Sequence, residues 1–273
     1  MLEKLEKTAR TAILQSGDVI RRHMAMGSEY AVHNKGPSDY VTEIDRESEE
    51  LIIQAIRRDF PHHQIMAEET SNIKLEEDVT WIIDPLDGTT NFIHGFPFVA
   101  VSIAVAMRKQ VVVGMVLDPV RDELFTARRG RGARLNGQRL QLKQLTELDQ
   151  ALVATGFPFR AKHLLEPYLN TFRAVFSRVS GIRRAGSAAL DLAYVAAGRV
   201  DGFWEAGLKP WDVAAGSLLV TEAGGRVDDF WGNRGYLQNG HIVAGIDPVH
   251  PFLMDQVQQF LAPAVSRSTA GHF

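Results

Sequence analysis

The chain contains no cysteine among its 273 residues. That absence excludes disulfides, thiolate zinc sites and phosphatases with a cysteine nucleophile, and it fits a reducing compartment. No uninterrupted apolar run approaches the roughly 18 residues that a membrane span requires. The charged start Met1–Lys7 also lacks the apolar core of a signal peptide. We therefore expect a cytoplasmic protein with no membrane association.

A strong excess of charge is missing as well. The formal net charge is −3 at pH 7, so composition implies no polyanion-binding surface over the whole molecule. Basic residues cluster in one stretch, as Arg121, Arg128, Arg129, Arg131, Arg134 and Arg139. Arg-Gly pairs suit RNA backbones, but only Phe125 lies among these arginines for base stacking. The pattern therefore favours a solvated hairpin over a nucleic-acid contact.

Apolar periodicity predicts many short elements, with no linker rich in Pro, Gly or Ser between them. Spacing predicts a helix over 2–26, and Thr42 with Asp45 predicts the capped start of a second helix. The other predicted elements are strands at 64–67, 79–83, 98–107 and 110–117, a hairpin of 133–135 and 138–142 turning at Asn136-Gly137, strands at 151–155, 181–185, 200–205 and 241–245, and helices at 165–178, 187–197, 211–223 and 249–261.

This order of elements predicts how the chain is organised. Its apolar content of 45% can fill a large core. The strands of the first half look antiparallel, whereas the second half alternates strands and helices. We expect a single domain over 1–261, with layered subregions at about 1–145 and 146–261, followed by a flexible tail over 262–273.

The run Trp81–Phe92 carries the most chemical information. Its apolar start predicts a buried strand that delivers Asp84 and Asp87, and Gly88-Thr89-Thr90 then predict a helix N-terminus. Carboxylates gathered around a dianionic phosphate would repel it unless cations intervene. Oxygen ligands without a histidine or cysteine cluster favour Mg²⁺ over Zn²⁺. The pattern suggests metal-assisted hydrolysis of a phosphate ester.

Two motifs carry a resemblance to a known family. Asp84-Pro85-Leu86-Asp87-Gly88-Thr89-Thr90 resembles the first signature of the inositol monophosphatases, and Trp211–Gly216, closing at Glu222–Gly225, resembles the second. The resemblance runs from the first helix to about residue 261, and the bacterial SuhB-type members look most similar. It implies an α/β (α+β) fold, a layered αβαβα sandwich of the inositol monophosphatase/fructose-1,6-bisphosphatase type. It further implies a homodimeric, lithium-sensitive, Mg²⁺-dependent phosphatase that hydrolyses the small monoester inositol 1-phosphate.

The resemblance also assigns metal ligands for two to three Mg²⁺ ions. Glu68, Asp84 and the backbone carbonyl of Leu86 would bind the first ion. Asp84, Asp87 and Asp212 would bind the second, with Asp84 bridging the pair. A third, weaker ion would sit on Glu68 largely through waters. Two cations about 4 Å apart can clamp the attacking and leaving oxygens of an in-line displacement.

The remaining site residues follow from the same resemblance. Thr89 would hydrogen-bond the attacking water, Asp45 would orient Thr89 and relay a proton, and Glu69 would support the site without binding metal. The backbone N–H groups of Gly88 and Thr89 would hold the phosphate at a helix start. The hydroxyls of the polyol would meet Asp87, Gly186, Ser187, Ala188, Glu205 and Asp212.

Other functions stay open from the sequence. Another ester could be the substrate, such as histidinol phosphate, a 3′,5′-bisphosphate nucleotide or fructose bisphosphate, although no basic pocket for a second phosphate is recognisable near the motifs. Haloacid dehalogenase-type phosphatases also follow a strand with Asp-x-Asp-Gly-Thr and use the first Asp as nucleophile, but Asp84 and Asp87 are three residues apart. Some SuhB-type relatives act in transcription antitermination complexes without needing phosphatase activity. A transcription-complex or RNA partner is therefore a further alternative, which no residue demonstrates.

Overall fold

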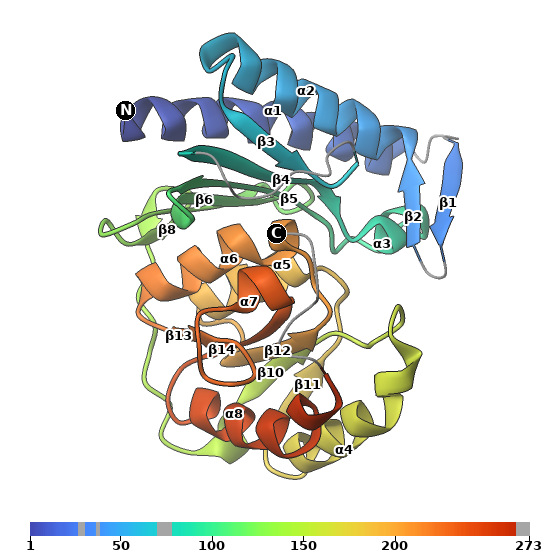
Figure 1. The fold of residues 1–273 in the computed structure, drawn as a ribbon, viewed down its shortest axis with the longest axis vertical. Helices are drawn as coiled ribbons and strands as arrows, with labels where there is room; N and C mark the ends of the chain where they lie inside the picture. Colours follow the sequence, from blue (N-terminus) through green and yellow to red (C-terminus); the bar gives the residue numbers. More distant parts are fainter. Residues whose placement is uncertain (27–30, 37–38, 70–77, 266–273) are drawn as a thin grey trace.

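The computed structural model describes residues 1–26, 31–36, 39–69 and 78–265. Its helices and sheets stack in five layers, in the order helices, sheet, helices, sheet, helices (Figure 1). This arrangement confirms the layered αβαβα fold that the motifs imply. Among the described residues, no helix is long and apolar enough to cross a membrane.

The first layer consists of α1 (Leu2–Met26) and α2 (Glu43–Asp59), which pack against each other and against the first sheet. Both helices bury an apolar stripe against the sheet, which is why their sequences show helical periodicity. The predicted cap of the second helix is present: the Thr42 hydroxyl accepts from the N–H of Asp45, and the Asp45 carboxylate accepts from the N–H of Thr42.

The second layer is a seven-stranded sheet in the order β3-β4-β5-β6-β7-β8-β9. Its β3 and β4 are parallel, and all other neighbours are antiparallel. The strands are β3 (Gln64–Ala67), β4 (Val79–Asp87), β5 (Ala100–Met107), β6 (Gln110–Asp118), β7 (Glu123–Arg128), β8 (Ala133–Leu135) and β9 (Gln138–Arg139). The near-continuous apolar runs in β4, β5 and β6 follow from helices covering both faces of the sheet.

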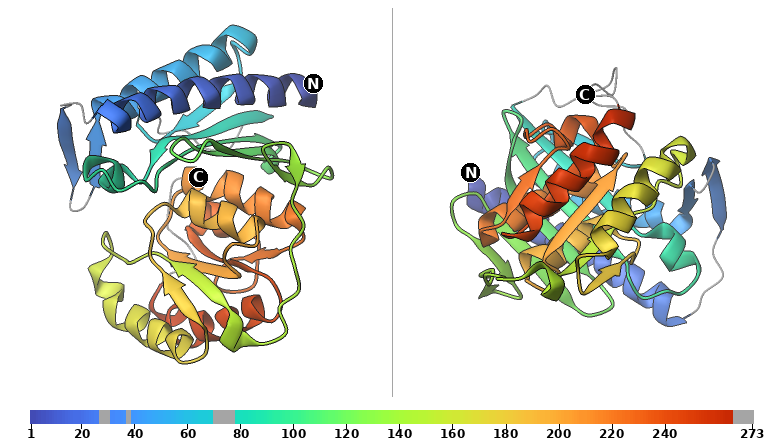
Figure 2. Two further views of the ribbon diagram at one scale, coloured as in Figure 1. Left: turned by 180° about the vertical axis from the view of Figure 1, so that it is seen from behind. Right: turned by 90° about the horizontal axis from the view of Figure 1, so that it is seen from below.

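The middle helices α5 (Ala188–Ala196) and α6 (Pro210–Ala223) separate this sheet from a five-stranded one in the order β11-β10-β12-β14-β13. Its strands are β10 (Leu152–Thr155), β11 (Gly181–Arg183), β12 (Gly202–Ala206), β13 (Arg226–Asp228) and β14 (His241–Gly245). Figure 2 shows α4 (Leu165–Phe176) and α8 (Val249–Phe260) on the face of this sheet that lies away from the middle helices.

Three hydrophobic clusters fill the spaces between the layers. One joins α1 and α2 to the seven-stranded sheet, one surrounds α5 and α6, and one lies between the five-stranded sheet and α8. Because α5 and α6 are covered on two sides, both are apolar around most of their circumference, unlike the amphipathic outer helices. The two motif-bearing segments, β4 and α6, therefore meet at the centre of the molecule.

Several short elements escape the sequence reading. Apart from α3 (Thr89–Ile93), which begins at the predicted helix start, they are β1 (Val32–Gly36), β2 (Asp39–Thr42), β7, β13 and α7 (Tyr236–Asn239). Each is too short for a periodic pattern to stand out, and β1 with β2 forms only a two-stranded sheet. The predicted hairpin is present, but β9 ends at Arg139, because the chain then leaves the sheet edge.

The end of the chain departs in part from the expected tail. Residues 262–264 form a 3-10 helix, and Ala262 is buried against α8. The rest of the predicted tail, 266–273, lies outside the described residues. The division into subregions at about residue 145 stays a prediction.

Candidate active site

Three aspartates from two distant segments converge where β4 meets α6. Asp84 and Asp87 come from β4, and Asp212 comes from the first turn of α6. One carboxylate oxygen from each lies within 4.8 Å of the others. In the described part of the chain, this is the group of side chains with the geometry to hold a metal ion.

An irregularity in β4 brings Asp84 and Asp87 together. Residues three apart on a regular strand point to opposite faces of the sheet. Here Asp84 pairs with Ser102 and Asp87 pairs with Ala100. The two aspartates are three residues apart on β4, whereas their partners are two residues apart on β5. The extra residue is a β-bulge, and it turns both carboxylates toward the same side. Spacing alone would therefore have separated the two ligands.

The carboxylates of Asp84 and Asp212 are each oriented by one backbone donor. The N–H of Leu86 donates to Asp84 Oδ1 at 3.0 Å, and the N–H of Lys209 donates to Asp212 Oδ2 at 2.7 Å. The second contact also caps α6, since the N3 position of a helix commonly carries an acid that bonds back to the cap. In both residues the other carboxylate oxygen remains a potential ligand.

Asp87 is fixed from the start of α5. Ser187 Oγ donates to Asp87 Oδ2 at 2.6 Å, and the N–H of Ala189 donates to the same oxygen at 2.8 Å. Ser187 is also the N-cap of α5, where its hydroxyl accepts from the N–H of Leu190. The predicted Gly186-Ser187-Ala188 segment thus lies beside Asp87, and part of its hydrogen-bonding capacity is taken by this carboxylate.

Burial and mutual repulsion make the cluster hard to ionise without a cation. Burial, followed by the charges of Glu68, Asp87 and Asp212, raises the pKa of Asp84 well above its usual value. Burial and the charge of Asp212 raise the pKa of Asp87 to about 7. Burial raises the pKa of Asp212, whereas the hydrogen bond from the N–H of Lys209 and the charge of Arg160 act to lower it.

A hard divalent cation would relieve both effects, because it lowers the cost of keeping the buried carboxylates ionised. The three groups offer oxygen ligands only, which suits Mg²⁺, Mn²⁺ or Ca²⁺ better than Zn²⁺. The residues present therefore fit the metal that the sequence predicts.

The hydroxyl of Thr89 lies between the carboxylate of Asp45 and the backbone of β4. Thr89 Oγ1 lies 3.1 Å from Asp45 Oδ1 and 3.1 Å from the carbonyl oxygen of Leu86. Asp45 is fully buried, and Thr42 donates to its other oxygen. Burial raises the pKa of Asp45 to about 6, although the hydrogen bonds from Thr42 oppose the shift. A carboxyl that titrates near neutral pH is suited to exchanging a proton with a hydroxyl.

Glu68 and Glu69 follow β3 and face this region. The N–H of Glu68 donates to the carbonyl of Ile83 at 3.2 Å, which extends the parallel pairing of β3 with β4. Glu68 raises the pKa of Asp84 through its charge, and Glu69 does the same to Asp45. Glu68 is not part of the close group of three aspartates.

Glu49 and Asn91 support the site, and the sequence reading missed both. Glu49 is 1% exposed on α2, and its Oε2 accepts from the N–H of Glu69 at 2.9 Å. The side-chain amide of Asn91 donates to the carbonyls of Phe98 and Ala185, which ties the start of α3 to the segment before α5. An acid on the apolar face of a predicted helix was the available signal for Glu49.

Gly88 permits the turn that follows β4. Its φ of 95° lies in the left-handed region, and a Cβ there would approach the carbonyl oxygen of Phe98 to 3.0 Å. Glycine is therefore the residue that fits between the last aspartate of β4 and the α3 helix. The turn leads directly into α3, whose first N–H groups have no acceptor within the helix.

Glu205, from β12, completes the acidic side of the site. Burial and the charge of Asp212 raise the pKa of Glu205 to about 8, while Arg184 opposes the shift. The backbone at Gly156 lies so close that a Cβ there would overlap the Glu205 carboxylate, at 1.9 Å from its carbon. The charge of Asp212 thus acts on Glu205, and the role of Glu205 in substrate binding stays a prediction.

Asp191 is a further buried acid that was not predicted from the sequence. It is 4% exposed within the apolar α5, and burial followed by the charges of Glu205 and Asp87 raises its pKa well above normal. Arg184 opposes this shift, and Arg160 opposes the corresponding shifts at Asp87 and Glu205. A charged residue between Leu190 and Leu192 was the visible signal for a buried acid.

Comparisons with known proteins show what the chain as a whole is similar to. The model of the family described as "Inositol monophosphatase family" matches residues 1–265. The chain is 49% identical to a protein of Pseudomonas aeruginosa named "Nus factor SuhB", over 97% of this chain and 100% of that protein. It resembles the crystal structure of extragenic suppressor protein suhB from Bartonella henselae, with TM-score 0.89, 41% identity and coverage of 93% and 98%. A structure of inositol monophosphatase from Anabaena matches with TM-score 0.83, 35% identity and coverage of 95% and 97%.

Proposed function

Because the chain belongs to the inositol monophosphatase family, we propose that it is a Mg²⁺-dependent phosphatase that hydrolyses inositol 1-phosphate. The observation that carries this proposal is the convergence of Asp84, Asp87 and Asp212 within 4.8 Å, beside the Thr89 hydroxyl. One buried and two half-buried carboxylates are costly to keep ionised without a cation. Next to a hydroxyl and a helix start, they suit a metal-bound phosphate ester.

The proposed ligands are those that the motifs predict. Glu68, Asp84 and the carbonyl of Leu86 hold one Mg²⁺, and Asp84, Asp87 and Asp212 hold a second, with a third held more weakly by Glu68. When bound, these cations offset the charge of the phosphate and acidify a water molecule for attack on phosphorus. The hydrogen bonds from Leu86, Ser187 and Lys209 keep the carboxylates oriented before metal arrives.

Thr89 and Asp45 handle the proton of the attacking water. The Thr89 hydroxyl has one proton, so it can donate either to Asp45 or to the carbonyl of Leu86 while its oxygen accepts from the water. Asp45, held by Thr42 and shifted toward neutral pH, is suited to receive a proton through Thr89. Glu69 supports this pair through its charge and does not bind metal.

Substrate contacts lie on two sides of the carboxylates. The N–H groups of Gly88 and Thr89 hold the phosphate at the start of α3. On the alcohol side, Asp87, Glu205 and Asp212 accept hydrogen bonds from the polyol, and the backbone of Gly186, Ser187 and Ala188 borders the same space. A polyol offers several hydroxyl donors, which matches a wall of carboxylates.

Phosphate release from inositol 1-phosphate tests this function. The wild type should release phosphate only with Mg²⁺, and Asp84→Asn should reduce the rate by orders of magnitude. Asp149→Asn, an exposed aspartate outside the site, is the matched control and should keep wild-type activity. No release from any phosphate monoester by folded, Mg²⁺-loaded wild type would refute the proposal. Release from histidinol phosphate, a nucleotide bisphosphate or fructose bisphosphate alone would refute only the choice of ester.

The names of relatives favour a second role. Because proteins up to 49% identical are named Nus factor SuhB, we propose that this chain also joins a transcription antitermination complex. Capture of transcription elongation factors by the tagged protein tests this role, and Thr89→Ala should capture them equally well if catalysis is dispensable. Failure of the wild type to retain any elongation factor above a mock control would contradict it.

We also propose that the protein is a homodimer. Large apolar side chains are exposed on α4 and on the loop before it, including Phe159 (47%), Leu165 (48%) and Phe176 (67%). A cluster of exposed apolar side chains of this kind commonly marks a protein interface. Sedimentation equilibrium should give twice the chain mass of 30.3 kDa, and a monomer mass at high concentration would contradict this proposal.

A further inference from the structure

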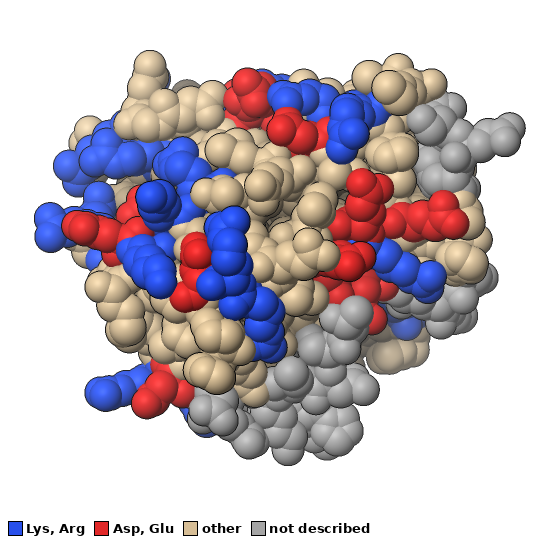
Figure 3. Space-filling view, turned by 90° about the horizontal axis from the view of Figure 1, so that it is seen from above, with Lys and Arg blue, Asp and Glu red and all other residues tan. Residues whose placement is uncertain are grey.

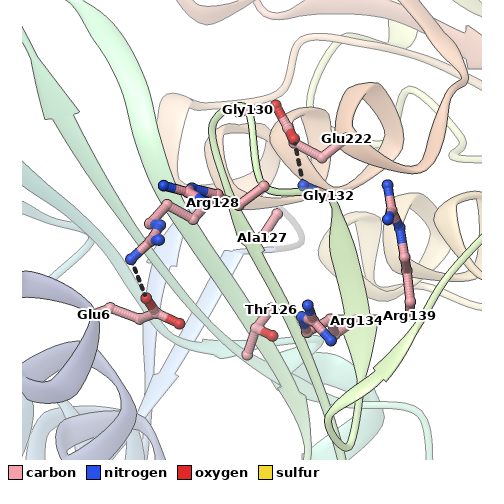
Figure 4. Close-up of a pocket in the computed structure, with 10 residues that line it drawn as sticks. Glu6, Thr126, Ala127, Arg128, Gly130, Gly132, Arg134, Arg139 and Glu222 are labelled. Atoms are coloured by element: carbon pink, nitrogen blue, oxygen red, sulfur yellow. Dashed lines mark hydrogen bonds and ion pairs between the residues drawn. The ribbon is translucent and has the colours of Figure 1, made fainter. Parts of the chain in front are cut away.

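A polar pocket lies away from the carboxylates, at the β7–β8–β9 edge of the seven-stranded sheet. Its volume is about 600 Å³. The lining residues are Glu6, Thr126, Ala127, Arg128, Gly130, Arg131, Gly132, Arg134, Arg139 and Glu222 (Figure 4). Four of the ten are arginines, and the walls offer few apolar side chains. Such a pocket suits a hydrophilic anion, not an apolar ligand.

The pocket is separated from the active site by the length of α6. Glu222 lines the pocket from the last turn of α6, whereas Asp212 stands in the first turn of the same helix. At 1.5 Å of rise per residue the two lie about 15 Å apart along the helix. The arginines are therefore not part of the phosphatase site.

Two of the arginines face each other across the hairpin. Arg134 on β8 and Arg139 on β9 are direct partners in the antiparallel register. Directly opposite side chains have Cβ atoms about 5 Å apart, and like charges in that position destabilise a strand pair. The two side chains therefore leave the hairpin from neighbouring positions, and Nη1 of Arg134 donates to the carbonyl of Gly137 at 3.2 Å. An anion bound between them would offset their repulsion.

The two glutamates of the pocket compensate half of the formal charge of its four arginines. Glu6 pairs with Arg128, with 3.3 Å between Oε2 and Nη1. Glu222 uses both carboxylate oxygens on backbone donors, the N–H groups of Gly130 and Gly132, each at 2.8 Å. In the described part of the chain no acid forms an ion pair with Arg131, Arg134 or Arg139. Four arginines and two glutamates give the pocket a net formal charge of +2, and the guanidinium groups of Arg131, Arg134 and Arg139 are available to a ligand.

The turn between β7 and β8 keeps the arginines in place. Glu222 fixes Gly130 and Gly132 to the end of α6, as Figure 4 shows for the bond to Gly132. A Cβ at Gly132 would lie 3.4 Å from Nε of Arg139, and φ at this residue is 80°. Glycine therefore allows the Arg139 side chain to lie close against the turn. The backbone of the pocket is therefore held by defined contacts, and the exposed side chains of Arg131, Arg134 and Arg139 project from it.

The surrounding surface extends the positive charge. Figure 3 shows Lys and Arg side chains gathered on the left of the view from above, the side on which Figure 1 places β8. Acidic side chains gather on the opposite side of the same face. A net charge of −3 for the whole chain therefore conceals a local positive region around the pocket.

We propose that this pocket binds an anion with two or more closely spaced phosphate groups through Arg131, Arg134 and Arg139. Guanidinium groups match phosphate oxygens in a two-pronged geometry, and the paired arginines can each engage a separate phosphate. The phosphates can belong to a small polyphosphate or to the backbone of single-stranded RNA. The open, polar pocket accommodates either source.

Binding of two probes to the full-length protein in EDTA tests the proposal. The probes are inorganic tripolyphosphate and an oligouridylate of roughly ten nucleotides. Without divalent cations the aspartate cluster repels phosphates, so binding reports on the arginines. The test variant combines Arg131→Gln, Arg134→Gln and Arg139→Gln. The control variant combines Arg22→Gln, Arg173→Gln and Arg178→Gln, three exposed arginines outside the pocket, and has the same net charge.

The test variant should bind at least tenfold more weakly than the wild type, whereas the control variant should bind within about twofold. For the oligonucleotide, the slope of log affinity against log salt should fall by about 2 in the test variant. Loss for tripolyphosphate assigns a small anion, and loss for the oligonucleotide alone assigns an RNA backbone. Equal weakening in both variants, or no binding by the wild type, would overturn the proposal.

A thermal measurement guards against a folding defect in the test variant. Because the facing arginines repel each other, their removal should leave the melting temperature unchanged or raise it in EDTA. Tripolyphosphate should raise the melting temperature of the wild type and the control variant but not of the test variant. Unchanged Mg²⁺-dependent phosphatase activity in the test variant would separate this pocket from the active site.

Discussion

Replacing Asp87 by Asn should change how the stability of the metal-free protein depends on pH. Burial and the charge of Asp212 raise the pKa of Asp87 from 3.8 to about 7. Between these two values the folded state keeps a proton that the unfolded chain releases. The free energy of unfolding therefore falls as the pH rises from about 4 to about 7, and the loss persists at higher pH. The Asn variant has no such group.

The size of the effect follows from the shift. A shift of about 3 units corresponds to about 4 kcal/mol as an upper bound, and about two thirds of it develops between pH 5 and pH 8. An unfolding entropy of about 2 cal/mol/K per residue converts this fraction to roughly 5 °C in melting temperature for 273 residues. A cation at the cluster would remove the penalty in the wild type.

Scanning calorimetry in EDTA at about pH 5 and pH 8 measures the effect. The melting temperature of Asp87→Asn minus that of the wild type should rise by several degrees between the two pH values. Asp149→Asn, exposed and remote from the site, should show no such change. Addition of Mg²⁺ at pH 8 should raise the melting temperature of the wild type more than that of Asp87→Asn. A difference that does not vary with pH would refute the reasoning that links the buried carboxylates to a cation.

Three further predictions concern the reaction. Thr89→Ala should lower kcat by about 10²–10⁴ with little change in melting temperature, whereas the exposed neighbour Thr90→Ala should keep kcat within about twofold; equal losses would remove Thr89 from catalysis. Burial raises the pKa of Glu205 to about 8, so this residue holds a proton below that pH. The KM of the wild type for the ester should therefore change as the pH rises through 8. A Glu205→Gln variant with the same pH profile of KM would contradict this role. Gly156→Ala should displace the Glu205 carboxylate and shift KM in the same direction as Glu205→Gln, and wild-type KM would show that the contact is unimportant.

Local sequence patterns were enough to predict most of the helices and strands and the types of residue in the site. The helices of the outer layer, the buried strands and the capped start of α2 were predictable because periodicity and capping depend on neighbours in the chain. Short elements such as β7 and β13 were missed, because three to six residues give no reliable period.

The residues that support the site could not be predicted from sequence motifs. Glu49 contacts the site across 20 residues of chain, and Asn91 joins segments 94 residues apart. The paired arginines at 134 and 139 looked like a solvated hairpin, because their shared pocket also needs Glu222 from a helix almost 90 residues away. Contacts between distant segments leave no trace in local spacing.

The sequence alone determined which carboxylates and hydroxyls the chain carries, and it placed them at the ends of strands and helices through hydrophobic periodicity. Only the tertiary structure decided that Asp84 and Asp87 share a side, because a β-bulge against β5 reverses the normal alternation. It also decided that Asp212 joins them, since packing of α6 on the sheet fixes the distance between segments more than 120 residues apart in the chain. The sequence therefore fixes which carboxylates can bind a metal ion, whereas the packing of the chain fixes their positions relative to one another.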